Sequence, residues 1–340
     1  VADFATTHGS QAAIEGEPLG VFRKLIVSES PQARLSVIER HGYRRFTAPK
    51  FDAEKALARM QHLEAFRARK RDFDADADGF DHASNLIDTS IEVLGVDMTC
   101  DLFFAAEREY WQRRNHAARV QKARQDRLGL GWANHDHHTY RSSRRTFAPL
   151  VALWEKLGLH CRERFYAGRE AGWGAQVMEQ PVTGIITFND VDLTPDELMG
   201  DFSHDGLDER DRLGTVGLWC GLHGDSFLQA GMHHLEAQFD FESLRKQLEE
   251  EGNVKTMKPF TDFPYLRQAF TEGERWKVPP KRIDKLRQSG LITDEQAQQF
   301  RDQGAIGSHL ENLERNDGFK GFNQTGVSEI ISATDPRKQA

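Results

Sequence analysis

Histidines and carboxylates recur at alternate positions in three short segments that lie far apart in the sequence. The segments are NHDHHTYRSS from residue 134, MHHLEAQF from residue 232 and SHLENLER from residue 308. Alternate side chains of an extended strand lie on one face. If each strand turns one face inward, His137, His234 and Glu311 can converge. Two imidazoles and one carboxylate form the facial triad of non-haem Fe(II) oxygenases, and the same set also suits Mn(II) or Zn(II).

Other polar residues share these strand faces. In the first segment His138 points to the opposite face from His137, and in the third His309 lies two positions before Glu311. Several polar residues share a strand face with His137, His234 or Glu311. They are His135, Thr139, Arg141, Glu236, Gln238, His309 and Arg315. We predict that His135 and His309 contact the metal ligands without binding the metal themselves. A histidine on a strand can equally be a hydrogen-bonded packing residue, and that alternative stays open.

Composition restricts the classes of partner. The chain has 340 residues and a net charge of −8, which argues against a nucleic-acid-binding protein. No apolar run approaches the roughly 18 residues that a membrane span needs, and the first residues, VADFATTHGSQAAIEGE, lack the pattern of a signal peptide. The three cysteines are isolated, which predicts buried thiols in a reducing compartment. We therefore expect a cytoplasmic protein without nucleic-acid or membrane partners.

Residues 1–130 have mostly helical patterns. Asp52 can cap a helix in which apolar residues recur at helical spacing. The acidic run DFDADADGFDH reads as a loop, and as a calcium loop it would lack its twelfth carboxylate, because Asn85 stands there. A single long helix is expected from residue 101 to about residue 128.

Residues 131–340 have a different pattern. Residues 131–195 read as a strand, a helix and three strands, and residues 230–335 begin again with a strand and a helix. An interruption, two inserted helices and a last strand complete the second unit. No glycine-rich phosphate loop follows any strand, which disfavours a doubly wound sheet. We predict an α+β fold with an N-terminal helical region (1–130) and a metal-binding catalytic domain (131–340).

The chain from about residue 134 to 335 resembles the 2-oxoadipate dioxygenase/decarboxylase family of the vicinal oxygen chelate superfamily. Three pieces carry the resemblance in the family's order: DHHTYR with His137 and Arg141, HHLE with His234, and ENLERNDGFKGF with Glu311. The last piece is followed by ISATD, which contains Thr334. The resemblance implies paired βαβββ modules that form a cupped sheet around one metal ion.

The resemblance also implies an activity. It indicates an Fe(II)-dependent dioxygenase that uses O2 to decarboxylate and hydroxylate a small 2-oxo acid, as in the conversion of 2-oxoadipate to 2-hydroxyglutarate. Arg141 would clamp the substrate carboxylate, with further substrate contacts from Thr139, Gln238 and Arg315. Glu236 stands where the family has threonine, and we predict that it faces the pocket with a catalytic role. A carboxylate there favours a substrate with an amine or hydroxyl group, such as an amino-acid-derived 2-oxo acid.

Alternatives remain for both the reaction and the first ligand. A zinc or manganese isomerase, lyase or hydrolase of the same fold is one, and a noncatalytic small-molecule-binding protein is another. His41, in ERHGYRR, repeats the His-x-x-x-Arg spacing of His137 and is a rival first ligand. A homodimer is a further expectation.

Overall fold

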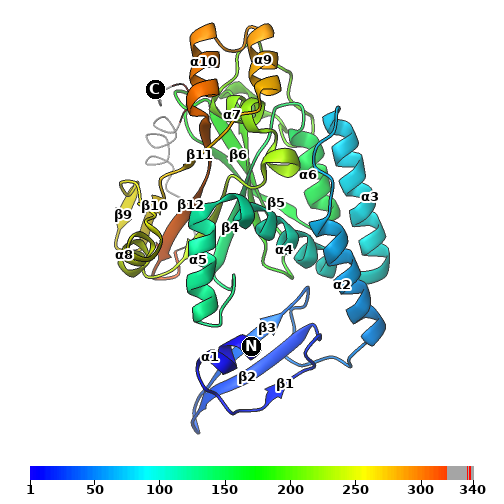
Figure 1. Cartoon of the computed structure of the whole chain (residues 1–340). Helices are drawn as coiled ribbons and strands as arrows, with labels where there is room; N and C mark the ends of the chain where they lie inside the picture. The colour runs from blue at the N-terminus through cyan, green and yellow to red at the C-terminus, as the bar shows by residue number, and fades with distance from the viewer. Residues whose placement is uncertain (320–334, 336, 338–340) are drawn as a thin grey trace.

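The central feature of the structure is a mixed sheet of nine strands, with helices packed beside it and a separate small sheet near the N-terminus (Figure 1). The structure is a computed structural model that describes residues 1–319, 335 and 337. Among these residues, no helix is both long enough and apolar enough to cross a membrane. The Gly-Phe loop beyond residue 319 and Thr334 lie outside the described residues.

The first module follows the predicted strand, helix and three strands. Its elements are β4 (His135–Arg141), α6 (Phe147–Lys156), β5 (His160–Tyr166), β6 (Trp173–Glu179) and β7 (Ile186–Asp192). The strands β5, β6 and β7 form an antiparallel meander, and β7 returns beside β4 in parallel orientation. The prediction of this module is confirmed.

The second module repeats this plan with insertions. Its elements are β8 (His234–Gln238), α8 (Phe241–Gly252), β9 (Thr261–Phe263), β10 (Leu266–Phe270), β11 (Glu274–Trp276), α9 (Pro280–Gln288), α10 (Asp294–Gln303) and β12 (Ala305–Arg315). β8 and β12 are parallel, and β10 joins β12 to β9 through antiparallel pairs. Strands β9 to β11 were not predicted, because each is at most five residues long and therefore carries little periodicity.

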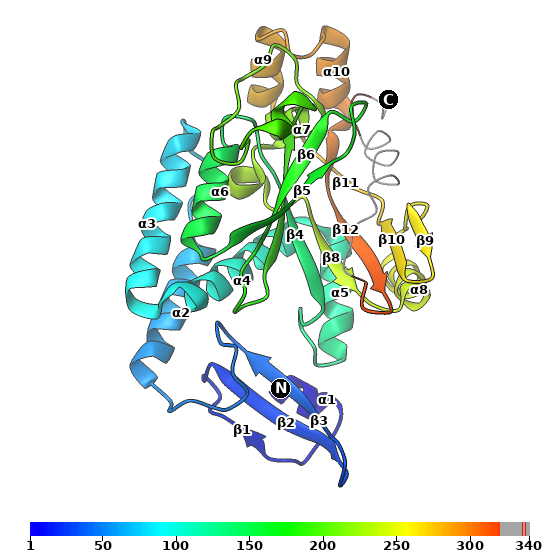
Figure 2. The same ribbon diagram turned by 180° about the vertical axis from the view of Figure 1, so that it is seen from behind.

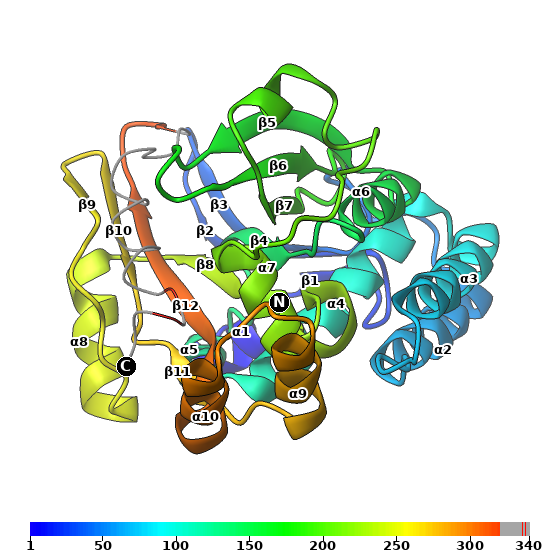
Figure 3. The ribbon, with the colours of Figure 1, turned by 90° about the horizontal axis from the view of Figure 1, so that it is seen from above.

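The two modules meet at the antiparallel pair β4 and β8. The strand order is β5-β6-β7-β4-β8-β12-β10-β9, with the ninth strand, β11, also paired with β12. Each module thus places its first strand beside its last. Seen from above, the two modules are the arms of one curved sheet (Figure 3). This paired βαβββ arrangement is that of the vicinal oxygen chelate fold, and it confirms the predicted α+β class. Between the modules lie η1 (Asp196–Met199), α7 (Thr215–His223) and a π-helical turn, η2 (Ser226–Ala230).

The N-terminal region contains a small sheet that the sequence did not predict. After α1 (Ala2–Thr7), strands β1 (Ile14–Glu15), β2 (Phe22–Glu29) and β3 (Arg34–Arg40) pair in antiparallel order. The helices that follow are α2 (Ala53–Arg67), α3 (Asp76–Leu94), α4 (Val96–Arg114) and α5 (His116–Arg127). Figure 2 shows α2, α3 and α6 along one side of the first module.

Two local expectations in this region are wrong. The acidic run is not a loop, because Asp76 and Asp78 lie in the first turn of α3, where carboxylates favour the helix dipole. The expected long helix is two helices that meet at Asn115, whose side chain accepts a hydrogen bond from the amide of Ala118. The predicted cap of Asp52 is confirmed by its bond from the amide of Lys55.

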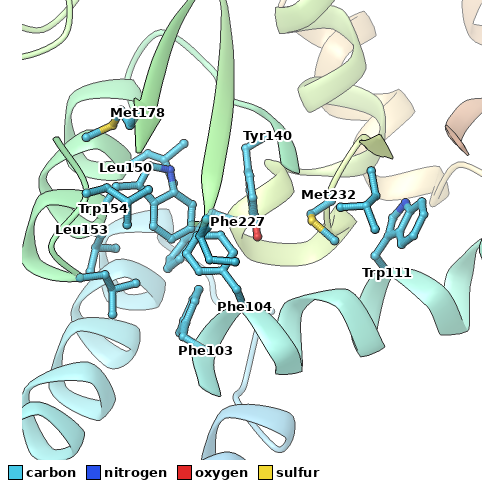
Figure 4. Packing of buried hydrophobic residues seen from close by; sticks show 14 of the residues in the cluster. Phe103, Phe104, Trp111, Tyr140, Leu150, Leu153, Trp154, Met178, Phe227 and Met232 are labelled. Carbon is cyan, nitrogen blue, oxygen red and sulfur yellow. The ribbon is translucent and has the colours of Figure 1, made fainter. Parts of the chain in front are cut away.

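One hydrophobic core joins the N-terminal helices to the catalytic region. Phe103 and Phe104 of α4 pack against Tyr140 of β4, Trp154 of α6 and Phe227 of η2 (Figure 4). All five side chains are at most 1% exposed. A division at residue 130 therefore separates sequence patterns, but the packing crosses it.

Candidate metal centre

Strands β4, β8 and β12 turn their polar residues to one face of the sheet. Thr139 is paired with His234, and Glu311 is paired with Glu236. Paired residues of neighbouring strands point to the same side. Tyr140, Leu235 and Leu310 alternate with the polar residues and belong to the hydrophobic core on the other side of the sheet; Leu235 and Leu310 are directly paired. The alternation seen in the sequence therefore separates a polar face from an apolar one.

The three predicted ligands come together on the polar face. One ligand atom from each of His137, His234 and Glu311 lies within 4.8 Å of the other two, and all three residues are buried. Glu311 Oε2 is 3.1 Å from His234 Nε2 and 3.7 Å from His137 Nε2. The two imidazoles thus share one carboxylate oxygen, at separations that one divalent ion could bridge.

Glu236 contacts the other edge of the first histidine. Its Oε2 is paired with His137 Nδ1, and its side chain is fully buried. A carboxylate at Nδ1 holds the proton there and leaves the Nε2 lone pair directed at Glu311. Arg315 Nη2 lies 3.8 Å from Glu236 Oε1. The sequence placed Glu236 and Arg315 against the substrate, whereas in the structure Glu236 contacts the ligand His137 and Arg315 contacts Glu236.

Gln268 of β10 orients Glu311 and was missed by sequence reasoning. Its Nε2 donates a hydrogen bond of 3.0 Å to Glu311 Oε1, which leaves Oε2 for the imidazoles. Gln268 is buried and lies in β10, in a segment for which the sequence predicts no helix or strand. No motif marks this residue, because its role depends on the pairing of β10 with β12.

The substrate contacts predicted for Thr139 and Gln238 are not evident in the geometry. Thr139 Oγ1 lies 2.8 Å from His234 Nε2, so it contacts a ligand atom. Gln238 is exposed at the end of β8.

His135 does not share the face of His137, and that expectation is wrong. The register of β4 against β8 shifts between His135 and His138, so that His135 pairs with Ala237. Its ring packs 4.9 Å from that of His138, on the core side. A β-bulge adds one residue to a strand and exchanges the faces beyond it. His138 points into the opposite packing as predicted, with Arg108 Nη1 3.1 Å from its Nε2.

His309 lies beside the trio and belongs to a second group of converging atoms. His233, His234 and His309 also offer ligand atoms within 4.8 Å of one another. The rings of His309 and His234 stack at 5.0 Å, and Phe270 packs 4.3 Å from His309. Burial lowers the pKa of all three imidazoles well below its usual value, which keeps them in the neutral, metal-binding form. In the described part of the chain, His309 Nε2 and His234 Nδ1 have no hydrogen-bond partner.

Arg141 carries a buried positive charge at the end of β4. Its Nε lies 3.7 Å from Asp190 Oδ2, and its guanidinium lies 5.5 Å from the ring centre of Trp219. Within the described residues, Arg141 Nε and Asp190 Oδ1 have no hydrogen-bond partner. Burial lowers the pKa of Arg141. Burial also raises the pKa of Asp190 to about 7, although the nearby charge of Arg141 acts to lower it. A buried guanidinium with unmatched donors suits an anionic ligand group. Sequence reasoning missed Asp190.

His41 lies apart from this centre. It follows β3, with Nε2 3.1 Å from Glu39 and Nδ1 3.2 Å from Asp101. Burial disfavours its charge, but the hydrogen bonds to Asp101 and Glu39 prevail and raise its pKa to about 9. Among the described residues, His41 belongs to no group of converging ligand atoms.

Comparisons with known proteins add little to this description. No family model matches the chain, and no curated protein matches it. Among solved structures, a glyoxalase superfamily protein from Ralstonia eutropha JMP134 is 13% identical, over 78% of this chain and 93% of its own, with a TM-score of 0.41. A mutant of 4-hydroxymandelate synthase from Streptomyces coelicolor is 15% identical over 60% of this chain, with a TM-score of 0.34.

A methylmalonyl-CoA epimerase from Mycobacterium tuberculosis is 11% identical, over 54% of this chain and 87% of its own, with a TM-score of 0.30. The chain spans 55% of the length of the 4-hydroxymandelate synthase. At such identities and scores these likenesses carry no argument about activity. The assignment of the fold rests on the strand order, and any function has to be argued from the site.

Proposed function

We propose that the protein is a non-haem Fe(II)-dependent dioxygenase that decarboxylates and hydroxylates a small 2-oxo acid. The observation that carries the proposal is the convergence of His137, His234 and Glu311 on one buried face. This face also holds Arg141, whose buried guanidinium lacks a full set of acceptors in the described structure.

The donor set fits a divalent transition metal. The trio offers two imidazole nitrogens and one carboxylate oxygen, and the pKa of His234 is lowered by burial, so that its ring is neutral. Two histidines and one carboxylate with open coordination positions are the pattern of Fe(II) oxygenases. When bound, Fe(II) would be held by His137, His234 and Glu311 and would supply the electrons that reduce O2.

The chain's own residues would position and enclose the reactants. Glu236 would hold the Nδ1 proton of His137, and Gln268 would hold one oxygen of Glu311. Arg141 would bind the substrate carboxylate in bidentate fashion. The rings of Phe188 and Phe270 lie 5.7 Å from His137 and 5.3 Å from His234, and would exclude water from this face.

The test is metal content followed by oxygen uptake. Protein purified without oxygen should bind about one iron per chain and consume O2 only when the right member of a 2-oxo acid panel is added. The panel should include members with a distal amine or hydroxyl group and amino-acid-derived members. Glu311→Ala should lose both properties, whereas Gln238→Ala, at the exposed end of β8, should keep them. A Glu311→Ala variant with unchanged iron and turnover would contradict the ligand assignment.

A zinc enzyme without redox chemistry is the second candidate. The observation in its favour is the group His233, His234 and His309, since three neutral imidazoles are a known catalytic zinc set. It would require tightly held zinc, no oxygen uptake, and a loss of metal in His309→Ala that exceeds the loss in Glu311→Ala. A chain that binds neither metal would leave a noncatalytic binding protein.

A further inference from the structure

We infer that the protein has a second metal site, for Zn²⁺, on its surface at the β5 edge of the sheet. Glu155, Cys161 and His204 each offer a ligand atom within 4.8 Å of the other two. They come from the last turn of α6, the start of β5 and the loop after η1. All three residues are exposed. The prediction that all the thiols are buried is therefore wrong for Cys161.

A fourth residue orients the histidine. His204 Nδ1 lies 2.7 Å from Asp201 Oδ2, and His204 Nε2 lies 2.9 Å from Glu155 Oε1. A carboxylate at Nδ1 is the usual partner of a metal-bound histidine, and Glu236 stands in the same relation to His137. Without a metal, the ring carries a proton on each nitrogen and donates to both carboxylates. A divalent cation at Nε2 would replace the proton on that nitrogen.

Two of the three ligands, together with Asp201, line a hollow in the surface. Cys161, Asp201 and His204 border a cavity of about 300 Å³, together with Arg162, Glu163, Arg164 and Gln176. Three protein ligands beside an open cavity leave a fourth position for water or a small anion. The two arginines at the cavity are already paired with carboxylates, Arg162 with Glu163 and Glu179, and Arg164 with Asp201.

The side chains around Cys161 offer a mixed set of ligand atoms. Its thiol converges with the His204 imidazole and the Glu155 carboxylate, which supply nitrogen and oxygen beside the sulfur. Zn²⁺ accepts sulfur, nitrogen and oxygen together, whereas Ca²⁺ and Mg²⁺ prefer oxygen alone.

This site is separate from the centre on β4. Two strands, β6 and β7, lie between β5 and β4. Three spacings of about 4.8 Å therefore separate β5 from β4, a distance of ~14 Å. The surface site therefore does not depend on the proposed dioxygenase activity.

The test is Co²⁺ binding to the full chain, followed by its absorption, since a thiolate ligand adds a charge-transfer band in the near ultraviolet. The band should appear in the unaltered protein and in Glu311→Ala. It should vanish in Cys161→Ser. Asp201→Asn should keep the band and weaken Zn²⁺ binding about 10- to 100-fold. Glu163→Gln, an exposed carboxylate at the same cavity, is the matched control and should change nothing.

Two results would overturn the inference. One is the absence of a charge-transfer band at saturating Co²⁺ in protein whose circular dichroism is normal. The other is a band that persists in Cys161→Ser, which would place the thiolate at one of the buried cysteines. Cys161 and Glu163 are exposed and Asp201 is half-buried, whereas Glu311 is buried, so the same circular dichroism measurement checks the folding of every variant.

Discussion

The arrangement around His137 predicts that Glu236→Gln weakens metal binding without removing a ligand. The carboxylate of Glu236 is paired with His137 Nδ1, while Nε2 on the opposite edge lies 3.7 Å from Glu311 Oε2. A glutamine oxygen can still accept the Nδ1 proton, but it lacks the charge that makes the imidazole a stronger donor to the metal. The number of ligands therefore stays at three, and only the strength with which the His137 imidazole binds the metal falls.

The expected size of this effect follows from the role. Loss of a carboxylate that supports a metal-bound histidine typically costs 10- to 100-fold in affinity, which is about 1.4–2.8 kcal/mol. Glutamine keeps the hydrogen bond, so we expect about 10-fold for Glu236→Gln and about 100-fold for Glu236→Ala. Replacing a direct ligand, as in Glu311→Ala, should cost far more than either.

Competition with a chelator of known affinity, carried out on Fe(II) or Mn(II) without oxygen, measures these differences. Gln238→Ala serves as the control, because it lies on the same strand but is exposed. Unchanged affinity in Glu236→Ala would refute the orienting role. A loss in Glu236→Gln as large as that in Glu311→Ala would show that Glu236 itself binds the metal.

Three further predictions concern the site and the fold. Arg141→Lys should raise the KM for 2-oxo acids more than it lowers kcat, with metal content unchanged, since lysine cannot form a bidentate pair. Glu107→Leu should cost about 3–5 kcal/mol in urea unfolding, because it leaves Arg69 and Arg71 buried without their shared carboxylate. His41 has a pKa of about 9 when folded and an ordinary pKa of 6.5 when unfolded, so its stabilisation is complete below pH 6.5 and disappears as pH rises through 9. His41→Gln should remove that pH dependence, at most about 1 kcal/mol for this partly exposed pair, and leave metal content unchanged.

Local patterns determined the strands and helices of the first module and the faces of the central strands. Side chains alternate along any extended chain, so the spacing of His234, Glu236 and Gln238 placed them on one face before any contact was known. Helix caps are similarly local, and the bond accepted by Asp52 lies where the sequence indicated it. Short strands such as β9 and β11 carry too few residues for a period to appear.

The tertiary structure decided which of these faces meet and which residues support them. The bulge in β4 moved His135 to the core side, and strand register brought Gln268 to Glu311 and Asp190 to Arg141. Each of these relations joins segments that are distant in sequence or depends on a one-residue shift of register. The sequence by itself therefore determined the ligand types and their spacing, while only the packed sheet could determine the orientation of each ligand, because orientation depends on partners that no local pattern encodes.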